Sequence, residues 1–124
     1  MDILAIKPQT ITVDLKHPAT GMPIGISVEC QSLESDAVKA VERQIKNKAM
    51  RSGRNTMTAE KVEDNAIAIL SAAIVSWTWA DGVELDGVKN PPCNQENKEK
   101  FLALPWAARQ IDAPLGDETA FFTK

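Results

Sequence analysis

Few side chains in this 124-residue sequence are of the types that carry out catalysis. His17 is the single histidine, and it stands in the turn-rich stretch HPATGMP, which favours a surface residue over a base or a ligand. The motifs GxSxG, HExxH and the phosphate-binding GxxxxGK loop do not occur. We therefore expect that the protein is not an enzyme, with no catalytic residue and no small-molecule substrate.

The residue types that bind metals are also poorly spaced for that purpose. Cys30 and Cys93 are far apart and belong to no CxxC pair, whereas a zinc site needs four ligands at characteristic spacings. The stretch DGVELDG has Asp81 and Asp86 but lacks the bidentate glutamate of a calcium loop. We expect reduced thiols, a solvated turn, and neither a metal nor a cofactor.

Charge is unevenly distributed around a formal net value of -3. Residues 39–54 carry six basic side chains against a single acid, Glu42. On a helix such a stripe is more often a solvated face than a phosphate-binding face. No aromatic residue is interleaved with it, because every Phe and Trp follows residue 76. We do not expect nucleic acid as a partner, and a small nucleic-acid-binding regulator remains the weakest alternative.

Two patterns predict a β-hairpin and then an amphipathic helix. The segments TITVDL and IGISVEC alternate apolar and polar residues on either side of a turn, which predicts a hairpin over residues 10–30. After Ser35, a suitable N-cap, apolar residues recur every three or four positions, which predicts a helix over 35–50. Gly53 and Asn55 then break the helix.

A second helix is predicted from its cap and its composition. Thr58 can cap a helix over residues 58–80, whose later turns, AIAILSAAIV at 66–75, are apolar on nearly every side. The apolar run is shorter than the ~20 residues that a bilayer requires, and the first turns are charged, so we expect no membrane span. Such a helix must be covered by its own domain or by a partner.

The C-terminal part predicts two shorter helices and a tail. Asn94 can cap a helix over residues 94–104, and Pro105 suits the first position of another over 105–111. Residues 112–124 lose periodicity and are expected to form a mobile tail. The predicted fold class is α+β, mainly α: a single globular domain over 1–111, with an N-terminal β-hairpin followed by three to four helices.

A domain of this size has few other elements that could cover a helix that is apolar on nearly every side. Large exposed apolar patches usually mark binding surfaces, so we expect self-association or a protein partner. On a helix Trp77 and Trp79 would lie about 200° apart, which leaves open which of them belongs to the core and which to an interface. The candidate partner-binding residues are Ile69, Leu70, Ile74, Trp77, Trp79, Phe101 and Trp106.

The order of short motifs from about Val62 to Ile111 resembles the tail assembly chaperones of long-tailed, siphovirus-type bacteriophages. In that family a tryptophan follows the long helix, and a DGxxxxG-like turn, a proline-rich bend, an "EN" helix start and an "LP" near the helix end come after it. The matching positions here are Trp77, 81–87, Pro91 and Pro92, Glu96 and Asn97, and Leu104 and Pro105.

The resemblance implies a small helical protein without catalytic residues. It implies binding to the apolar helices of the tape-measure protein and recruitment of tail-tube protein during tail morphogenesis. It also implies residence in the cytoplasm of the infected bacterial host and absence from the mature virion. A structural phage tail or head-tail connector protein is the alternative, and that protein would remain in purified particles.

Many members of this family are made in two lengths by a programmed frameshift. The C-terminal Ala120-Phe121-Phe122 is compatible with a slippery run of uridines in the gene. If a longer product exists, residues 112–124 are its linker to a second domain.

Overall fold

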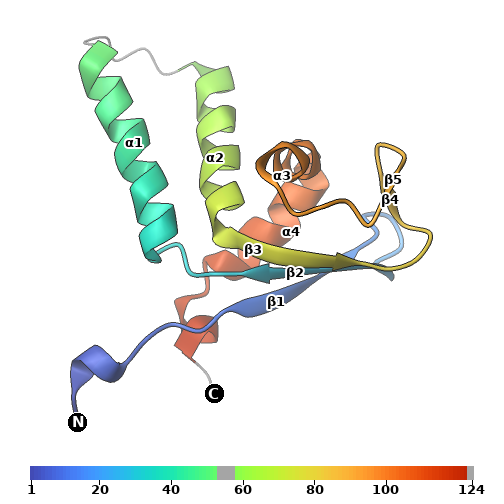
Figure 1. Cartoon of the computed structure of the whole chain (residues 1–124), viewed down its shortest axis with the longest axis horizontal. Coiled ribbons are helices and arrows are strands. Elements are labelled where there is room, and N and C mark those ends of the chain that lie inside the picture. The colour runs from blue at the N-terminus through green and yellow to red at the C-terminus, as the bar shows by residue number, and fades with distance from the viewer. Residues whose placement is uncertain (53–57, 123–124) are drawn as a thin grey trace.

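In the part of the chain that a computed structural model describes, residues 1–52 and 58–122, a three-stranded antiparallel sheet carries helices α1 to α4 on one side (Figure 1). The architecture is α+β and mainly α in one small domain, which confirms the predicted fold class. Gly53 and Asn55, the predicted helix breakers, and Arg54 of the basic stripe lie outside the described residues.

The N-terminal hairpin consists of β1 (Ile11–Lys16) and β2 (Pro23–Cys30), within the predicted range 10–30. The strands pair antiparallel, with Val13 opposite Val28. In the connecting turn the Nδ1 atom of His17 accepts a hydrogen bond from the Ala19 N–H at 3.1 Å, so the imidazole supports the local backbone. A short 3-10 turn, η1 (Ile3–Ala5), precedes β1.

Helices α1 (Asp36–Ser52) and α2 (Ala59–Ala73) form an antiparallel pair that stands up from the sheet (Figure 1). The Oγ atom of Ser35 accepts from the Val38 N–H at 3.5 Å, and the Oγ1 atom of Thr58 accepts from the Lys61 N–H at 3.2 Å. Both helix starts therefore use the side-chain caps that the sequence indicates.

The prediction that the second helix continues to residue 80 is wrong. It ends at Ala73, and the chain passes directly into β3 (Ile74–Trp79), which pairs antiparallel with β2. The segment IVSWTW is rich in β-branched and aromatic residues, which suit a pleated strand. The free edge of β2 supplies a partner for its backbone groups, and this tertiary pairing prevails over the apolar run.

A small second hairpin follows β3. Strands β4 (Glu84–Leu85) and β5 (Val88–Lys89) are joined by Asp86 and Gly87, whose φ angles are 51° and 78°. Positive φ at both central residues defines the type I′ turn, and Asp-Gly is a favoured pair for it. The second half of the acidic stretch 81–87 therefore forms strand β4 and a hairpin turn, and Asp81 and Gly82 form a separate turn before it.

The C-terminal helices are α3 (Gln95–Leu102) and α4 (Pro105–Leu115), which is longer than the predicted 105–111. The expected tail over 112–124 is also wrong for the described part: α4 continues, and a 3-10 helix, η2 (Glu118–Phe122), follows it. Leu115 extends the buried stripe of Ile111 by one turn, and Phe121 is buried in the core. The Gln9 N–H donates to the Phe121 carbonyl at 2.7 Å.

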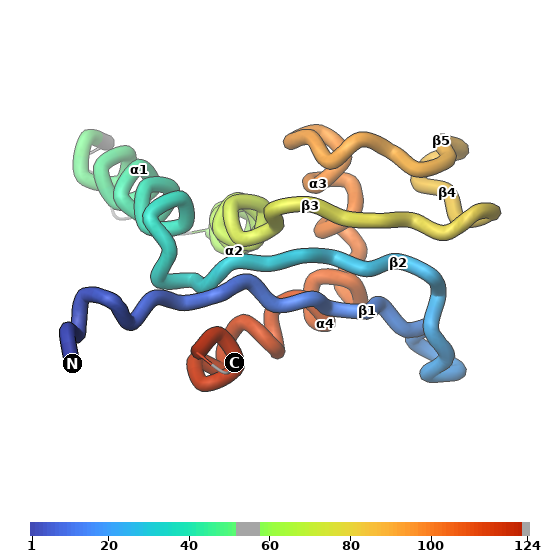
Figure 2. The backbone as a smooth tube through the Cα atoms, turned by 60° about the horizontal axis from the view of Figure 1, so that its bottom comes forward, coloured from blue at the N-terminus to red at the C-terminus, as the bar shows by residue number. Residues whose placement is uncertain are grey.

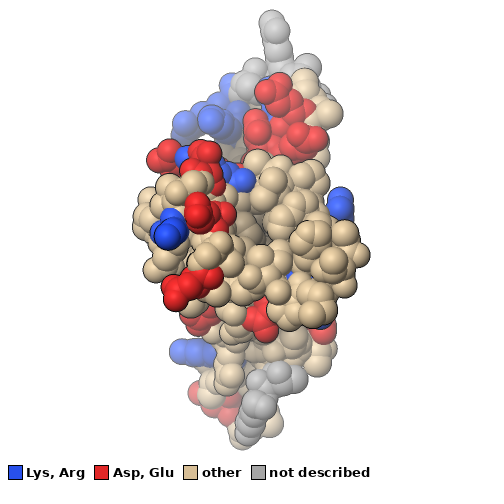
Figure 3. All heavy atoms as spheres, turned by 90° about the vertical axis from the view of Figure 1, so that its right-hand side faces the viewer, with Lys and Arg blue, Asp and Glu red and all other residues tan. Residues whose placement is uncertain are grey.

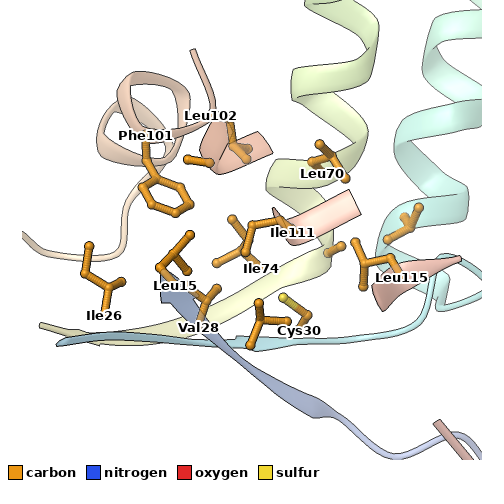
Figure 4. Close-up of a cluster of buried hydrophobic side chains, with 14 of the residues drawn as sticks. Leu15, Ile26, Val28, Cys30, Leu70, Ile74, Phe101, Leu102, Ile111 and Leu115 are labelled. Carbon is orange, nitrogen blue, oxygen red and sulfur yellow. The ribbon is translucent and has the colours of Figure 1, made fainter. Parts of the chain in front are cut away.

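The core lies between the sheet and the helices (Figure 4). Alternate residues of the three strands point into it, and the helices supply the opposing side chains. The largest fully buried apolar side chains, by volume, are Phe101, Phe121, Leu15, Ile74, Leu102, Ile111, Val28, Val38, Pro91 and Cys30.

The opposite face of the sheet is polar, and no helix of the described residues lies on it (Figure 2). Glu29 on the central strand accepts hydrogen bonds from the Thr10 hydroxyl at 2.8 Å and from the Ser76 hydroxyl at 3.0 Å. The Ser27 hydroxyl donates to Asp14 at 2.7 Å. This face is the solvated side of an antiparallel sheet.

The C-terminal segment can be tested with two adjacent phenylalanines. Phe121 is 1% exposed and Phe122 is 43% exposed. We predict that Phe121→Ala lowers the free energy of unfolding by roughly 3 kcal/mol, the lower end for a buried phenylalanine, whereas Phe122→Ala changes it little. Urea denaturation measures both. Equal, small effects would mean that this segment does not contribute to the core.

The hydrogen bonds of Glu29 with Thr10 and Ser76 lead to a prediction about how stability depends on pH. Hydrogen bonds from Thr10 and Ser76 hold the pKa of Glu29 below its ordinary value of 4.5. Its contribution to stability is therefore complete above pH 4.5 and is lost as the pH falls through the lower folded pKa. We expect Glu29→Gln to lower the melting temperature at pH 7 and to flatten its decline in acid. Thermal denaturation from pH 7 to pH 3 measures this, with Glu63→Gln on α2 as the control; parallel curves for wild type and Glu29→Gln would contradict it.

Candidate interaction surface

The structure divides the seven predicted partner-binding residues between core and surface. Leu70, Ile74, Trp79 and Phe101 are buried in the hydrophobic core, and Ile69, Trp77 and Trp106 are half-buried around it. The four buried residues present almost no surface to a partner in this conformation. Within the predicted set, most of the surface left to a partner belongs to Ile69, Trp77 and Trp106.

The tryptophan pair lies on one face of a strand. Trp77 and Trp79 are two residues apart in β3, so both point to the same side, and the expected separation of about 200° on a helix is wrong. Their ring centroids are 5.6 Å apart, and Phe101 of α3 lies 5.6 Å from Trp77 and 6.3 Å from Trp79, all edge to face. The Trp77 Nε1 donates to the Pro91 carbonyl at 2.8 Å. The cluster fixes α3 and the proline-rich bend against the sheet.

Helix α2 is only partly covered. Leu70 and Ala73 face the core, where the Lys98 ammonium of α3 donates to the Ser71 carbonyl at 3.2 Å. Val62 is exposed, and Ile69 remains half-buried. The apolar segment is therefore enclosed along one side and accessible along another.

An apolar hollow of about 330 Å³ lies where this accessible side meets α4. We call it the α2–α4 hollow. Ile69 and Leu70 of the predicted set line it, with Ala66 one turn earlier and Ala108 on the facing helix. Its remaining lining residues are Leu33, Arg109 and Asp112. An apolar surface with one side chain of each charge can bind an apolar segment and favour one orientation of it.

A second hollow, of about 370 Å³, lies at the end of the molecule that carries the hairpin turns. We call it the aromatic hollow. Trp79, Phe101 and Trp106 of the predicted set line it, together with His17, Pro18, Ile24, Ile26, Val83, Glu84, Leu85 and Leu104. The predicted residues thus form two separate surfaces, while Ile74 and Trp77 line neither.

Sequence reasoning missed the residues that shape these hollows. Ala66, Ala108 and Leu33 come from three separate elements, and their small or apolar side chains are ordinary in a helix or a loop. The only signal in the sequence was the position of Ala66 three residues before Ile69, on the same face of α2.

Two groups of charged side chains stand out on the surface. The described basic residues of the stripe, Lys39, Arg43, Lys46, Lys48 and Arg51, are exposed on α1. Lys39 forms an ion pair with Glu34 at 2.8 Å. Asp81, Glu84 and Asp86 lie at the other end, where Lys100 approaches Asp86 at 3.6 Å. Figure 3 looks onto that end and shows an uncharged area with acidic and basic side chains around it.

Both cysteines are free, Cys30 buried and Cys93 half-buried. Burial is the main cause that raises the pKa of Cys30 to about 12, and Glu29 and Cys93 add to it. Burial also raises the pKa of Cys93, against the influence of Lys98. Among the described residues, no group of three or more His, Cys, Asp or Glu side chains could hold a metal ion. In the same part of the chain, no helix is long and apolar enough to cross a membrane.

Comparison with known protein families, with curated proteins and with solved structures gives no match to this chain.

The two thiols should differ sharply in reactivity. Only the thiolate attacks an aromatic disulfide reagent, and a pKa of about 12 keeps Cys30 protonated at pH 8. We predict one fast equivalent of labelling at Cys93 and release of the second only on unfolding. Absorbance during labelling of the wild type and of Cys93→Ala measures this, because the variant should lose the fast phase. Two fast equivalents in the wild type would contradict the burial of Cys30.

Proposed function

We propose that this protein is a phage tail assembly chaperone, which binds the tape-measure protein and helps recruit tail-tube subunits during tail morphogenesis. The proposal assigns no catalytic residue and no cofactor. It places the protein in the cytoplasm of the infected bacterial host and not in the mature virion. The motif order around Trp77, the DG turn and the "EN" helix start supports it.

The α2–α4 hollow is the observation that carries the proposal. A chaperone for a long helical protein needs an accessible apolar surface that accepts one face of a helix. Ile69 offers such a surface at the edge of the core, with Leu70 beneath it. The polar open face of the sheet offers no comparable area, since Glu29 and Asp14 lie along it.

Small residues on both sides of the hollow favour a helix as the occupant. Helix axes pack about 8–10 Å apart, and the distance depends on the side chains at the contact. Ala66 of α2 and Ala108 of α4 leave room for the larger apolar side chains of a third helix. Arg109 and Asp112 at the hollow can pair with charges that flank the apolar face of that helix.

Filling the hollow with a charge tests the proposal without removing a core residue. Lysine is nearly as good a helix former as alanine, and Ala66 is exposed, so Ala66→Lys should leave the melting temperature unchanged. We predict that it weakens binding to a tape-measure fragment about tenfold or more, a cost of about 1.4 kcal/mol. Isothermal titration calorimetry measures the affinity.

Ala40→Lys is the matched control, because Ala40 is an exposed alanine inside α1 and does not line the hollow. Equal affinities for the two variants would contradict binding at the α2–α4 hollow. Mass spectrometry of purified virions separates the chaperone from a structural tail or connector protein, since only the latter remains in the particle.

A further inference from the structure

Residues 1–7 form an apolar arm that the rest of the described chain, residues 8–52 and 58–122, leaves exposed. Met1, Ile3, Leu4 and Ile6 are all exposed, and Leu4 is 79% exposed. The arm is nevertheless ordered locally: Asp2 caps η1 by accepting from the Leu4 N–H at 3.0 Å. Several large apolar side chains together on an ordered, exposed segment mark an interaction surface.

We propose that this arm, residues 1–7, docks into the aromatic hollow of a second copy of the chain. The arm extends from one end of the molecule, and the aromatic hollow lies at the opposite end, beside β4, β5 and the β1–β2 turn (Figures 1 and 2). The hollow is lined by aromatic and aliphatic side chains, which suit isoleucine and leucine.

Charge complementarity supports this occupant. The arm carries an exposed Lys7 directly after its apolar residues. The hollow is lined by Glu84, and Asp81 and Asp86 are close to it in the sequence. Figure 3 shows an uncharged area at this end, with charged side chains of both signs around it. Among the residues that line the hollow, Glu84 is acidic and none is a lysine or arginine, so the lysine of a docked arm would pair with Glu84.

The arm extends away from the aromatic hollow of its own chain (Figure 2). It is tied at Gln9, whose N–H donates to the Phe121 carbonyl at 2.7 Å. His17, at the hollow, lies about 26 Å further along an extended path of ~3.3 Å per residue. Ile3 precedes Gln9 by six residues and reaches at most about 21 Å, and the η1 turn shortens this. We therefore assign the contact to two chains.

A contact between opposite ends is heterologous, so repetition of it gives rings or open chains rather than a closed twofold dimer. The arm is short, and interfaces that bury less than about 1,200 Å² in total are weak and transient. The assembly should therefore depend on protein concentration. This contact does not rest on the proposed function, because it involves neither the α2–α4 hollow nor a phage partner.

Sedimentation velocity over a wide concentration range, with variants of the arm and of the hollow, tests the proposal. The double variant Ile3→Ser and Leu4→Ser should weaken self-association about tenfold or more and leave the melting temperature unchanged, because both side chains are exposed. Met50→Ser is the matched control: Met50 is also 79% exposed, but it lies at the end of α1.

Leu104→Ser tests the hollow itself. Leu104 lines the hollow, is 39% exposed, and occupies the N-cap position of α4 without a side-chain cap. Serine is a preferred N-cap, so the variant should weaken self-association without destabilising the fold. A wild type that stays monomeric, or arm and hollow variants that associate as strongly as Met50→Ser, would overturn the proposal.

Disulfide trapping distinguishes an arm–hollow contact between two chains from the same contact within a single chain. In a Cys93→Ala background, a Leu4→Cys protein mixed with a Leu104→Cys protein should oxidise to a crosslinked dimer. Thr78→Cys, on the open face of the sheet, should not form this dimer with Leu4→Cys. A doubly substituted chain that crosslinks only to itself would overturn the proposal.

Discussion

The direct passage of α2 into β3 is the constraint on which the rest of the structure depends. At Ile74 the backbone N–H still bonds to the carbonyls of Leu70 and Ser71, while the same residue already pairs with Cys30 of β2. No loop separates the two elements, so the helix direction is fixed relative to the sheet. Helix α1 then packs against α2, and Trp77 and Trp79 are placed on the helix side of β3.

This constraint decides which apolar surface is buried and which is left accessible. Strand β3 closes the core through the contact of Trp77 with Phe101, whereas α2 leans away from the sheet and is covered along one side only. The open face of the sheet is turned away from α2 and therefore does not cover the apolar side of this helix. Apolar surface remains in the α2–α4 hollow, in the aromatic hollow and on the N-terminal arm, and exposed apolar surfaces of this kind often mark interaction sites.

The sequence predicts the hairpin, α1 and the helix starts because these depend on local signals. Alternation marks residues 10–30, and Ser35 and Thr58 act as caps where the sequence indicates. IVSWTW was assigned to a helix because a short, continuous apolar run has no period that separates a strand from a buried helix. The segment becomes a strand because it pairs with β2, which is distant from it in the sequence. The prediction of a C-terminal tail is wrong because Phe121 packs into the core, and its carbonyl accepts from the N–H of Gln9, which is distant in the sequence. The hollows were out of reach for the same reason, since their lining comes from separate elements.

Hydrogen exchange measured by mass spectrometry, with and without a tape-measure fragment, tests most directly the claim that the open side of α2 is a binding surface for a helix. Amides of α2 around Ile69 and of α4 around Ala108 should exchange more slowly in the complex, while those of β1 remain unchanged. Slowing confined to the basic face of α1 or to the open face of the sheet, or none with any fragment, would contradict the account.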